Sequence, residues 1–535
     1  MSKIKDLIQK HKYEELWQTS CGFIDLSLNE FMDIQKWLLE EQLGLLNNCE
    51  LGKKVMRGAK PQTIEEFRRD VPLTTYIDYC PELLEKREDV LPAKPLYWIH
   101  TSGKSGEYPF KWVPISQRMW DELGPIACAT RLFLHAKHKG DVNIKKNVRL
   151  LNATAPMPYA SGLIAYKCAE EFNYKYLPAL QESEQMPFSE RIEKGFWLAL
   201  SEGITGVYGL AGVLVAIGER FKNKSGDVKL SAVLSRPRAL LRLLKGLIKS
   251  KLARRPMLPR DLWSLSAISC TGTDSVIFRD KIREMWGLVP LDVYASTESL
   301  FISMQTWDRT SMTVVPTMNF LEFIPEPEHL KWYADRSYQP KTVLLNEVKA
   351  GENYEVVITN FHGGAMVRYR IGDMVRITGL RNEALDIDIP QISFLRRADE
   401  LIDIAGFTRL TEKIIWQAIE NTGIPYVDWT LRKDVQAGKP VLHLYMELKD
   451  GCTASEQDVA SAVDEQLMAL DDDYPNLQAM LGMRPIIVTL LKGGAFLEFM
   501  SKRLADGADL AHLKPKHINP SDQVLSLLGV KSKPA

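Results

Sequence analysis

The chain has 535 residues, with 68 basic and 68 acidic side chains. This length exceeds one ordinary domain, so two or more folded units are expected. A formal net charge of zero argues against a general nucleic-acid-binding protein. Seven cysteines occur without a CxxC pair, which indicates a reducing compartment, no disulfide framework and no zinc site.

The N-terminus carries charges of both signs and lacks the apolar core of a signal peptide. We therefore expect a cytoplasmic protein. The most apolar stretch, Gly203 to Gly218, is too short to span a bilayer and is rich in glycine. We interpret it as a buried helix and expect no stable membrane insertion.

Helical periodicity dominates up to about Leu51, with Phe31, Ile34, Leu38 and Leu45 on one face. Short apolar runs then alternate with amphipathic helices as far as Leu300; they include PLYWIH, VRLLNA, LSAISC and VPLDVYA. This alternation is typical of a parallel α/β sheet. The region 312–379 is rich in strands, such as FLEFIPEP, VLLNEV and YEVVITN, and predicts a β-rich subdomain beside the main sheet.

After Asp399 the pattern changes to that of a compact α+β module. We predict helices over 411–421 and 455–470 and strands over 426–432, 440–448 and 485–491. The predicted fold class is therefore α/β, with a large N-terminal domain of mostly parallel sheets (1–395) and a small, mobile α+β C-terminal domain (400–535). A hinge over 396–399 would join the two.

One segment is strongly basic. From Arg236 to Arg255 the chain has eight basic residues, no acidic one, and leucines at helical spacing. A functional interpretation is a membrane-surface helix or a face for an anionic ligand. A simpler interpretation is an amphipathic helix whose basic face is solvated, and the sequence favours it.

The first motif with chemical meaning is TSGKSG, residues 101–106, directly after PLYWIH. Small hydroxyl and glycine residues let backbone N–H groups and hydroxyls surround phosphate oxygens. Lys111 follows at the end of this loop. The Gly-Lys-Ser core suggests a P-loop, but Trp98 replaces its first glycine and residues 108–113 read as a strand instead of a helix. We therefore do not favour a true P-loop.

Three further motifs follow predicted strands: CTGTD (270–274), YASTE (294–298) and RYRIGD (368–373). Tyr294 could stack on a purine, and Glu298 could bind Mg²⁺ through ligand phosphates. The carboxylate of Asp373 could accept two hydrogen bonds from a sugar diol. Together they point to a nucleotide. The simpler alternative is a set of ordinary strand-to-helix turns with N-caps.

The order of these motifs resembles the Gretchen Hagen family of acyl-acid amido synthetases, a branch of the adenylate-forming superfamily. The resemblance begins at FRRDVPLTTYIDYCPEL (67–83), includes the motifs above and reaches RRADELIDIAGFTRLTE (396–412). Near the end, Gly494-Ala495-Phe496 and Leu513-Lys514-Pro515 are similar to the family's Gly-x-Phe turn and lysine. Lys104 is a departure, because the family usually has threonine there.

This resemblance implies an AMP-forming ligase. It would activate a carboxylic acid with ATP and Mg²⁺ as an acyl-adenylate, and then transfer the acyl group to an amine, most often that of an amino acid. The family pattern assigns the nucleotide to Ser102, Gly103, Ser105, Thr271, Gly272, Tyr294, Thr297, Asp373 and Arg397. It assigns catalysis to Lys514 and Glu298, the metal to Glu298, and the hinge to Asp399.

The acyl pocket is expected from the middle region, about 155–250, with Met157, Tyr159 and Tyr208 as candidates. Ordinary core packing is the alternative for all three. His100, just before the phosphate loop, could act on substrate or could only pack. The expected partners are a small carboxylic acid and an amine, and the oligomeric state is not predicted.

Three other functions remain open at this point. A CoA ligase would share the first step and use a thiol acceptor. A non-catalytic nucleotide- or membrane-binding protein would use the basic 236–255 segment. A P-loop nucleotidase or kinase would release ADP and phosphate, whereas adenylation releases AMP and pyrophosphate.

Overall fold

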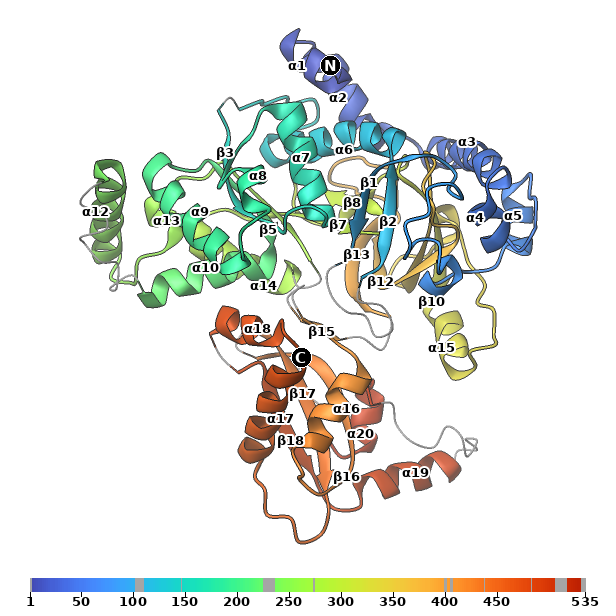
Figure 1. Ribbon diagram of the computed structural model, residues 1–535, viewed down its shortest axis with the longest axis vertical. Helices are drawn as coiled ribbons and strands as arrows, with labels where there is room; N and C mark the ends of the chain where they lie inside the picture. The colour runs from blue at the N-terminus through green and yellow to red at the C-terminus, as the bar shows by residue number, and fades with distance from the viewer. Residues whose placement is uncertain are drawn as a thin grey trace. The chain divides into compact units, whose positions relative to one another are not determined.

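The computed structural model describes residues 2–101, 110–145, 147–224, 236–272, 275–398, 402–404, 408–436, 438–482, 484–505 and 517–530. Contacts divide the chain into two compact units (Figure 1). Unit 1 contains most of the chain up to Arg396, and unit 2 contains the residues from Arg397 onward.

Unit 1 begins with a helical segment. Its helices are α1 (Lys3–Gln9), α2 (Tyr13–Cys21), η1 (Gly22–Asp25), α3 (Leu28–Asn47), α4 (Glu50–Val55), α5 (Ile64–Asp70) and η2 (Tyr76–Tyr79). Helix α3 starts at a capping box between Ser27 and Glu30, which satisfies backbone N–H groups that a helix start leaves unpaired. Phe31 and Leu38 are buried, whereas Ile34 and Leu45 are only partly buried, so the predicted apolar face is confirmed in part.

The core of unit 1 is one eleven-stranded sheet in the order β10-β11-β12-β13-β9-β8-β7-β6-β5-β3-β4. Its parallel part contains β3 (Arg149–Ala153), β4 (Lys175–Leu177), β5 (Gly206–Leu210), β6 (Ala267–Thr271) and β7 (Leu291–Ser296). The remaining strands are β8 (Leu300–Gln305), β9 (Met312–Val314), β10 (Asn319–Pro325), β11 (Asn353–Asn360), β12 (Tyr369–Gly379) and β13 (Gln391–Arg397). The β-rich region therefore continues the parallel sheet.

The remaining helices of unit 1 pack on this sheet or on one another. They are α6 (Gln117–His135), α7 (Ala160–Phe172), α8 (Leu180–Ser183), α9 (Phe188–Glu202), α10 (Ala211–Lys224), α12 (Pro237–Leu252), α13 (Pro259–Leu262), α14 (Ser275–Trp286), α15 (Glu326–Ala334) and the short η3 (Leu345–Glu347). Helix α6 packs against β6 and β8, and α9 packs against β3 and β4. The predicted α/β class is confirmed.

Three predicted elements differ in the structure. The segment 203–218, expected to be a buried helix, starts with strand β5 and continues as α10. A short apolar run cannot be assigned to a helix or a buried strand by periodicity alone. The run PLYWIH forms β1 (Pro95–His100), which pairs antiparallel with β2 (Trp112–Ser116) in a separate two-stranded sheet. The run VLLNEV contains η3 in place of a strand.

Unit 2 is a small α+β unit, as predicted. It contains β14 (Ile402–Ile404), β15 (Thr408–Leu410), α16 (Glu412–Asn421), β16 (Tyr426–Gln436), β17 (Lys439–Leu448), α17 (Glu456–Leu470), α18 (Tyr474–Leu481), β18 (Ile486–Leu491), α19 (Ala495–Ala505) and α20 (Asp522–Leu527). In its central sheet β17 pairs antiparallel with β16 and parallel with β18.

Two further expectations concern membrane-spanning helices and the cysteines. Within the described ranges, no helix combines the length and apolarity needed to cross a bilayer. All seven cysteines are free, as the scattered cysteine pattern predicts.

Candidate active site

Two of the predicted motifs meet in unit 1. The Tyr294 hydroxyl, at the end of β7, donates a hydrogen bond to Oδ2 of Asp373 on β12 at 2.9 Å. Both side chains are buried, and the Tyr294 ring lies 5.8 Å from the ring of Phe394. The structure therefore joins the YASTE and RIGD motifs, which are far apart in the sequence.

The turn that carries Glu298 is held by buried polar side chains. The Tyr369 hydroxyl lies 3.3 Å from Glu298 Oε1 as a hydrogen-bond donor, and the Asn360 amide donates to the Glu298 carbonyl oxygen at 2.9 Å. Asn319 donates to the carbonyl oxygens of Ser299 and Phe301 at 2.8 and 3.0 Å. Sequence reasoning did not single out these three residues, although Tyr369 lies inside the VRYRIGD motif.

Five further candidate residues lie at or just after the carboxyl ends of parallel strands. Strands β3, β5, β6 and β7 are parallel, so their carboxyl ends lie at the same edge, where α/β proteins bind ligands. Thr271 and Gly272 close β6 and are not fully buried, and Thr297 follows β7. Met157 and Tyr159 lie in the loop after β3.

The ends of the hydroxyl-rich loop are fixed near the loop after β3. The backbone N–H of His100 donates to the Pro158 carbonyl at 3.0 Å, and that of Thr101 to the Lys111 carbonyl at 3.1 Å. The Lys111 N–H lies 3.3 Å from Thr101 Oγ1. Strand β2 follows this loop, which contradicts a P-loop, because a P-loop opens into a helix.

The loop residues Ser102, Gly103, Lys104 and Ser105 lie outside the described part of the chain. His100, which precedes this loop, is buried. The Nδ1 atom of His100 lies 2.9 Å from the Thr101 carbonyl oxygen. Its ring contacts three aromatic rings, those of Phe110, Trp112 and Tyr159. Burial lowers the pKa of His100. These contacts favour a packing role.

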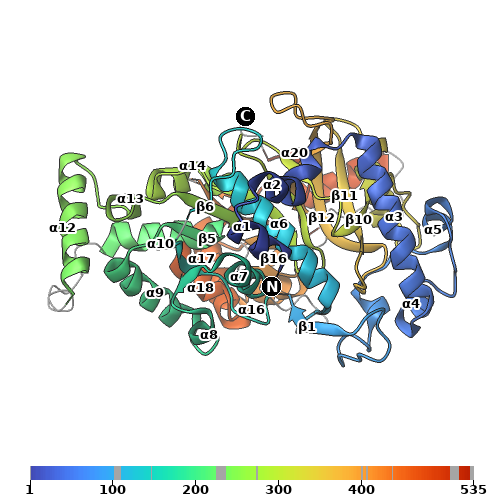
Figure 2. The ribbon, with the colours of Figure 1, turned by 90° about the horizontal axis from the view of Figure 1, so that it is seen from above.

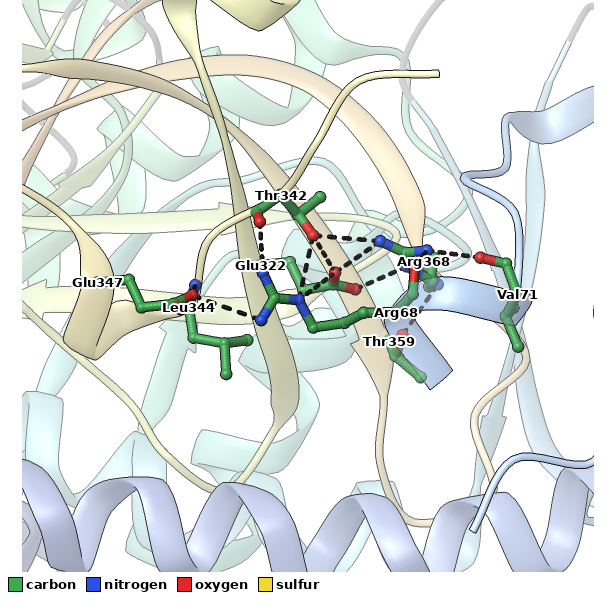
Figure 3. A network of polar contacts seen from close by, with 8 residues as sticks. All are labelled: Arg68, Val71, Glu322, Thr342, Leu344, Glu347, Thr359 and Arg368. Carbon is green, nitrogen blue, oxygen red and sulfur yellow. Dashed lines mark hydrogen bonds and ion pairs between the residues drawn. The ribbon is translucent and has the colours of Figure 1, made fainter. Parts of the chain in front are cut away.

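A buried ionic network fixes the strand that carries Asp373 (Figure 3). Arg368 donates to both Glu322 oxygens, through Nε at 3.0 Å and Nη2 at 2.8 Å. Its Nη1 donates to the carbonyl oxygens of Arg68 and Val71 at 2.7 and 2.5 Å. The Thr342 hydroxyl donates to Glu322 at 2.6 Å. The network ties the 67–83 segment to β10 and to the start of β12.

Arg370, the second arginine of the RYRIGD motif, also pairs with a buried carboxylate of unit 1. Arg370 donates to both oxygens of Glu355 at 2.9 and 2.7 Å, and its guanidinium lies 3.6 Å from the ring centroid of Trp332. His329 lies 2.7 Å from the same carboxylate. Of the charged residues in RYRIGD, Asp373 is therefore the one that pairs with a site residue.

A cavity of about 70 Å³ lies between helices α6 and α7 and the sheet. It is mostly apolar, and Tyr208, Arg131 and Ser269 are among its lining residues. Nε of Arg131 and Oγ of Ser269 are buried and have no hydrogen-bond partner among the described residues. A buried unpaired donor costs free energy, so these atoms favour a ligand with a polar group.

Strand register relates this cavity to the nucleotide loop. Tyr208 and Ser269 are paired across β5 and β6, and Thr271 follows two residues after Ser269. Residues two apart on a strand share a face and lie about 6.6 Å apart. The cavity is also lined by Gly206 and Ala267, the first residues of β5 and β6, so Ser269 is its lining residue nearest along β6 to Thr271. Met157 and Tyr159 are not among its lining residues, and Arg131 and Ser269 carried no sequence signal.

The acidic residues of this edge suit a magnesium ion that arrives with a nucleotide. No group of three His, Cys, Asp or Glu side chains in the described ranges could hold a metal ion by itself. Mg²⁺ in phosphate-transfer sites needs only one or two carboxylates, because phosphates and water complete its shell. Glu298, held by Tyr369 and Asn360, fits that requirement.

In unit 2, the predicted Lys514 and Asp399 lie outside the described residues, and Arg397 is the last, partly buried residue of β13. Three residues after Lys514, His517 bonds to Glu412 at 2.6 Å and to Asp428 at 3.0 Å. Burial alone would lower the pKa of His517, but the two carboxylates raise it to about 9.

The predicted Gly-x-Phe turn is formed at the start of α19. Gly494 has a positive φ of 83°, which glycine adopts without strain. The backbone N–H groups of Gly494 and Phe496 donate to the two oxygens of Glu447 at 2.6 and 2.9 Å. A carboxylate at the N-terminus of a helix is stabilising, so Glu447 stabilises the turn at Gly494 and the start of α19.

Comparison with solved structures identifies the fold of the chain. The solved structure of the AtGH3.15 acyl acid amido synthetase in complex with 2,4-DB matches with a TM-score of 0.52 and 19% identity, over 96% of both chains. A 2-hydroxyisobutyryl-CoA ligase matches with a TM-score of 0.52 and 14% identity, over 91% of both chains. The chain has the fold of these adenylate-forming ligases.

Sequence comparison gives the family. The GH3 family N-terminal domain matches residues 21–185, the central domain residues 312–397 and the C-terminal domain residues 410–523. The chain belongs to the GH3 family, as the motif order predicts. Jasmonoyl–L-amino acid synthetase JAR4 of Nicotiana attenuata is 29% identical over 41% of this chain. That alignment spans 37% of the relative, less than half its length.

Proposed function

We propose that this protein is an ATP-dependent acyl-acid amido synthetase that releases AMP and pyrophosphate. The observation that carries the proposal is the Tyr294–Asp373 hydrogen bond at 2.9 Å, which lies at the edge where α/β proteins bind ligands. Family membership supports it, since the similar proteins are named for joining acyl acids to amino acids.

In this proposal ATP occupies the carboxyl edge of the sheet. Tyr294 stacks on adenine, and Asp373 accepts hydrogen bonds from the ribose hydroxyls. Thr271 and Gly272 line the nucleotide, and Thr297 lies near its phosphates. The loop with Ser102, Gly103 and Ser105 surrounds the outer phosphates with hydroxyl and N–H groups, and Arg397 also contacts the nucleotide.

The first step joins two anions. The acid's carboxylate attacks the α-phosphorus of ATP, the bond to the pyrophosphate oxygen breaks, and an acyl-adenylate forms. Positive charge and N–H donors at the phosphates lower the barrier by stabilising the transition state. Mg²⁺ supplies part of that charge when it is bound beside Glu298. Lys514 supplies the rest.

The second step forms the amide. The amine's lone pair attacks the acyl carbon, AMP departs with the electrons of the anhydride bond, and the amine loses a proton to solvent or base. The mixed anhydride is sensitive to water, so exclusion of water is required. A hinge at residues 396–399, with Asp399 in it, lets the C-terminal domain serve each step in turn.

The cavity beside Tyr208 is our candidate for the acyl group. Its lining is mostly apolar, so the acid should have an apolar body. The unpaired Arg131 Nε and Ser269 Oγ favour an oxygen acceptor at the far end of that body. Met157 and Tyr159, in the loop after β3, would lie nearer the reacting carboxylate. We place the reaction in the cytoplasm, with no nucleic acid involved.

Acid-dependent exchange of pyrophosphate into ATP, measured across a library of carboxylic acids, tests this proposal. The Asp373→Ala variant should lose about 100-fold in exchange, because a misplaced nucleotide costs about that much. The matched control is Asp33→Ala, an exposed aspartate on α3, which should keep full exchange. Undiminished exchange in Asp373→Ala would refute the site.

The acceptor is tested separately by supplying a preferred acid with amino acids or with CoA. Amide formation with an amino acid is expected. Thioester formation with CoA and no amide would replace the proposed reaction by that of a CoA ligase, while the adenylate site would stand.

A further inference from the structure

Helix α12 exposes an unusual amount of apolar surface. Five of its large apolar side chains are exposed: Leu241 by 67%, Leu244 by 47%, Leu247 by 40%, Ile248 by 61% and Leu252 by 81%. They lie within sixteen residues. Single exposed leucines are common, but a contiguous exposed apolar patch marks an interaction site.

The helix packs against unit 1 through its small residues instead. Its buried positions are Ala239, Leu243, Gly246 and Ser250, and a Cβ on Gly246 would come within 2.7 Å of Leu262 and Met257. A surface helix normally turns its large apolar side chains to the core. In α12 only Leu243 of the large apolar side chains is buried by the unit, while five are exposed, so an apolar face remains for a partner outside the unit.

Helical geometry organises the outward face. At 100° per residue, Leu241, Leu244, Ile248 and Leu252 form one stripe opposite the buried positions. Lys245 and Lys249 flank the stripe on one side, and Lys251 flanks it on the other. Figures 1 and 2 both draw α12 at one end of unit 1, beyond α13 and α9.

The basic residues of this face lack acidic partners. The segment 236–255 contains no Asp or Glu, and Lys245, Lys249 and Lys251 form no ion pair with the described residues. Arg242 is different, because its Nη1 donates to the carbonyl oxygens of Leu200 and Ser201 and thereby anchors the helix to α9. The free positive charge is therefore concentrated beside the apolar stripe.

We propose that α12 binds reversibly to an anionic lipid surface. An interfacial helix has an apolar face with lysine and arginine beside it, and it lies in the plane of the membrane with that face in the headgroup region. Anionic lipids attract such lysines. A second copy of this chain fits less well, because two faces with the same positive flanks would repel each other. This proposal is independent of the proposed reaction.

Vesicle cosedimentation with the full-length chain tests the proposal. Vesicles of phosphatidylcholine with 30% phosphatidylserine should bind at least about tenfold more protein than pure phosphatidylcholine, and high salt should reduce that binding. A triple variant, Leu244→Ser, Ile248→Ser and Leu252→Ser, should lose about tenfold or more in binding, because the apolar area buried in the interface sets its strength.

A charge-matched pair of variants separates the helix from overall charge. Lys245→Glu, Lys249→Glu and Lys251→Glu together should abolish binding, whereas Lys53→Glu, Lys60→Glu and Lys137→Glu, which alter exposed lysines elsewhere, should retain it. Equal loss in both triples would overturn the proposal, as would equal binding to both lipid mixtures. Self-association that the serine variant disrupts, without lipid binding, would assign the face to a second copy.

All altered side chains are exposed, so the variants should fold. Circular dichroism and thermal unfolding check this for each of them. If the serine variant unfolds, the glutamate triple still decides the outcome, because its substitutions remove no apolar contact.

Discussion

Two basic regions of unit 1 differ in whether their positive side chains are paired with carboxylates. In β12 and the residue before it, Arg368 and Arg370 each form a two-bonded pair with a buried glutamate. In α12, the lysines of the outer face have no acidic neighbour in the sequence segment, whereas Arg242 donates to carbonyl oxygens of α9.

The difference shows how a charged side chain can serve structure or remain available for binding. A guanidinium in the core must be paired and fully hydrogen-bonded, because an isolated buried charge is very costly. Arg368 and Arg370 meet that requirement, and by doing so they fix the strand that carries Asp373. Exposed lysines need no such pairing. The lysines of α12 can therefore lie beside the exposed leucines and remain available to an external partner.

The largest expected effect comes from breaking the pair in β12. Replacing Arg368 by methionine removes both of its hydrogen bonds to the buried Glu322 and leaves Arg68, whose Nε lies 3.9 Å from Glu322 Oε1, as the nearby cation. Loss of one partner from a buried ion pair costs about 3–5 kcal/mol, and we expect that loss in urea unfolding. The control is Arg238→Met in α12, an exposed arginine, which should change stability by less than about 0.5 kcal/mol. Equal stability of both variants would contradict a structural role for the network.

A second, smaller effect concerns the ion pairs of unit 2. His517→Gln removes a cation that bonds to Glu412 and Asp428, and we expect a loss of about 1–3 kcal/mol at pH 6. The folded pKa, about 9, is raised from the ordinary 6.5. The stabilisation is therefore complete below about pH 6.5 and disappears as the pH rises through 9.

Thermal unfolding of His517→Gln and the natural chain from pH 6 to pH 10, followed by tryptophan fluorescence, measures this effect. The His517 ring stacks on Trp429 with centroids 4.3 Å apart, so at least one of the twelve tryptophans lies at this site. A stability difference that grows with pH would contradict the charged state assigned to His517.

The smallest effect separates two arginines of α12 itself. Arg242→Ala removes the hydrogen bonds to α9 carbonyls and should cost about 1–2 kcal/mol. Arg238→Ala should be neutral within about 0.5 kcal/mol. Urea unfolding measures both. If the two variants are equally stable, α12 is not anchored by Arg242, and the contrast between anchored and free charges in this helix fails.

Much of the fold could be predicted from local patterns. The two helices and three strands predicted for unit 2 match α16, α17, β16, β17 and β18 within a few residues, because each has an apolar face and clear turn residues, whereas β14, β15, α18, α19 and α20 were not predicted. The errors fall where local sequence is ambiguous. Gly206 and Gly209 in β5 are apolar enough for either a helix or a strand, and only the neighbouring strands β3 and β6 decide the outcome.

The candidate site likewise contains residues that the sequence predicted and residues that only the structure revealed. Tyr294, Glu298, Thr271 and Asp373 were predicted because glycine, hydroxyl and acidic residues after strands have a recognisable chemistry. Tyr369, Asn360 and Asn319, which hold the Glu298 turn, and the cavity residues Arg131 and Ser269 had no such signal. Their roles come from contacts between segments distant in the chain.

The sequence by itself determined the family, the order of the motifs and the charge of α12, because these depend on residue type and spacing alone. Only the tertiary structure decided that Tyr294 meets Asp373, that Arg368 is paired and unavailable to a ligand, and that the leucines of α12 face outward. The physical reason is that partnership and burial depend on which surfaces pack together, and packing joins residues that the sequence separates.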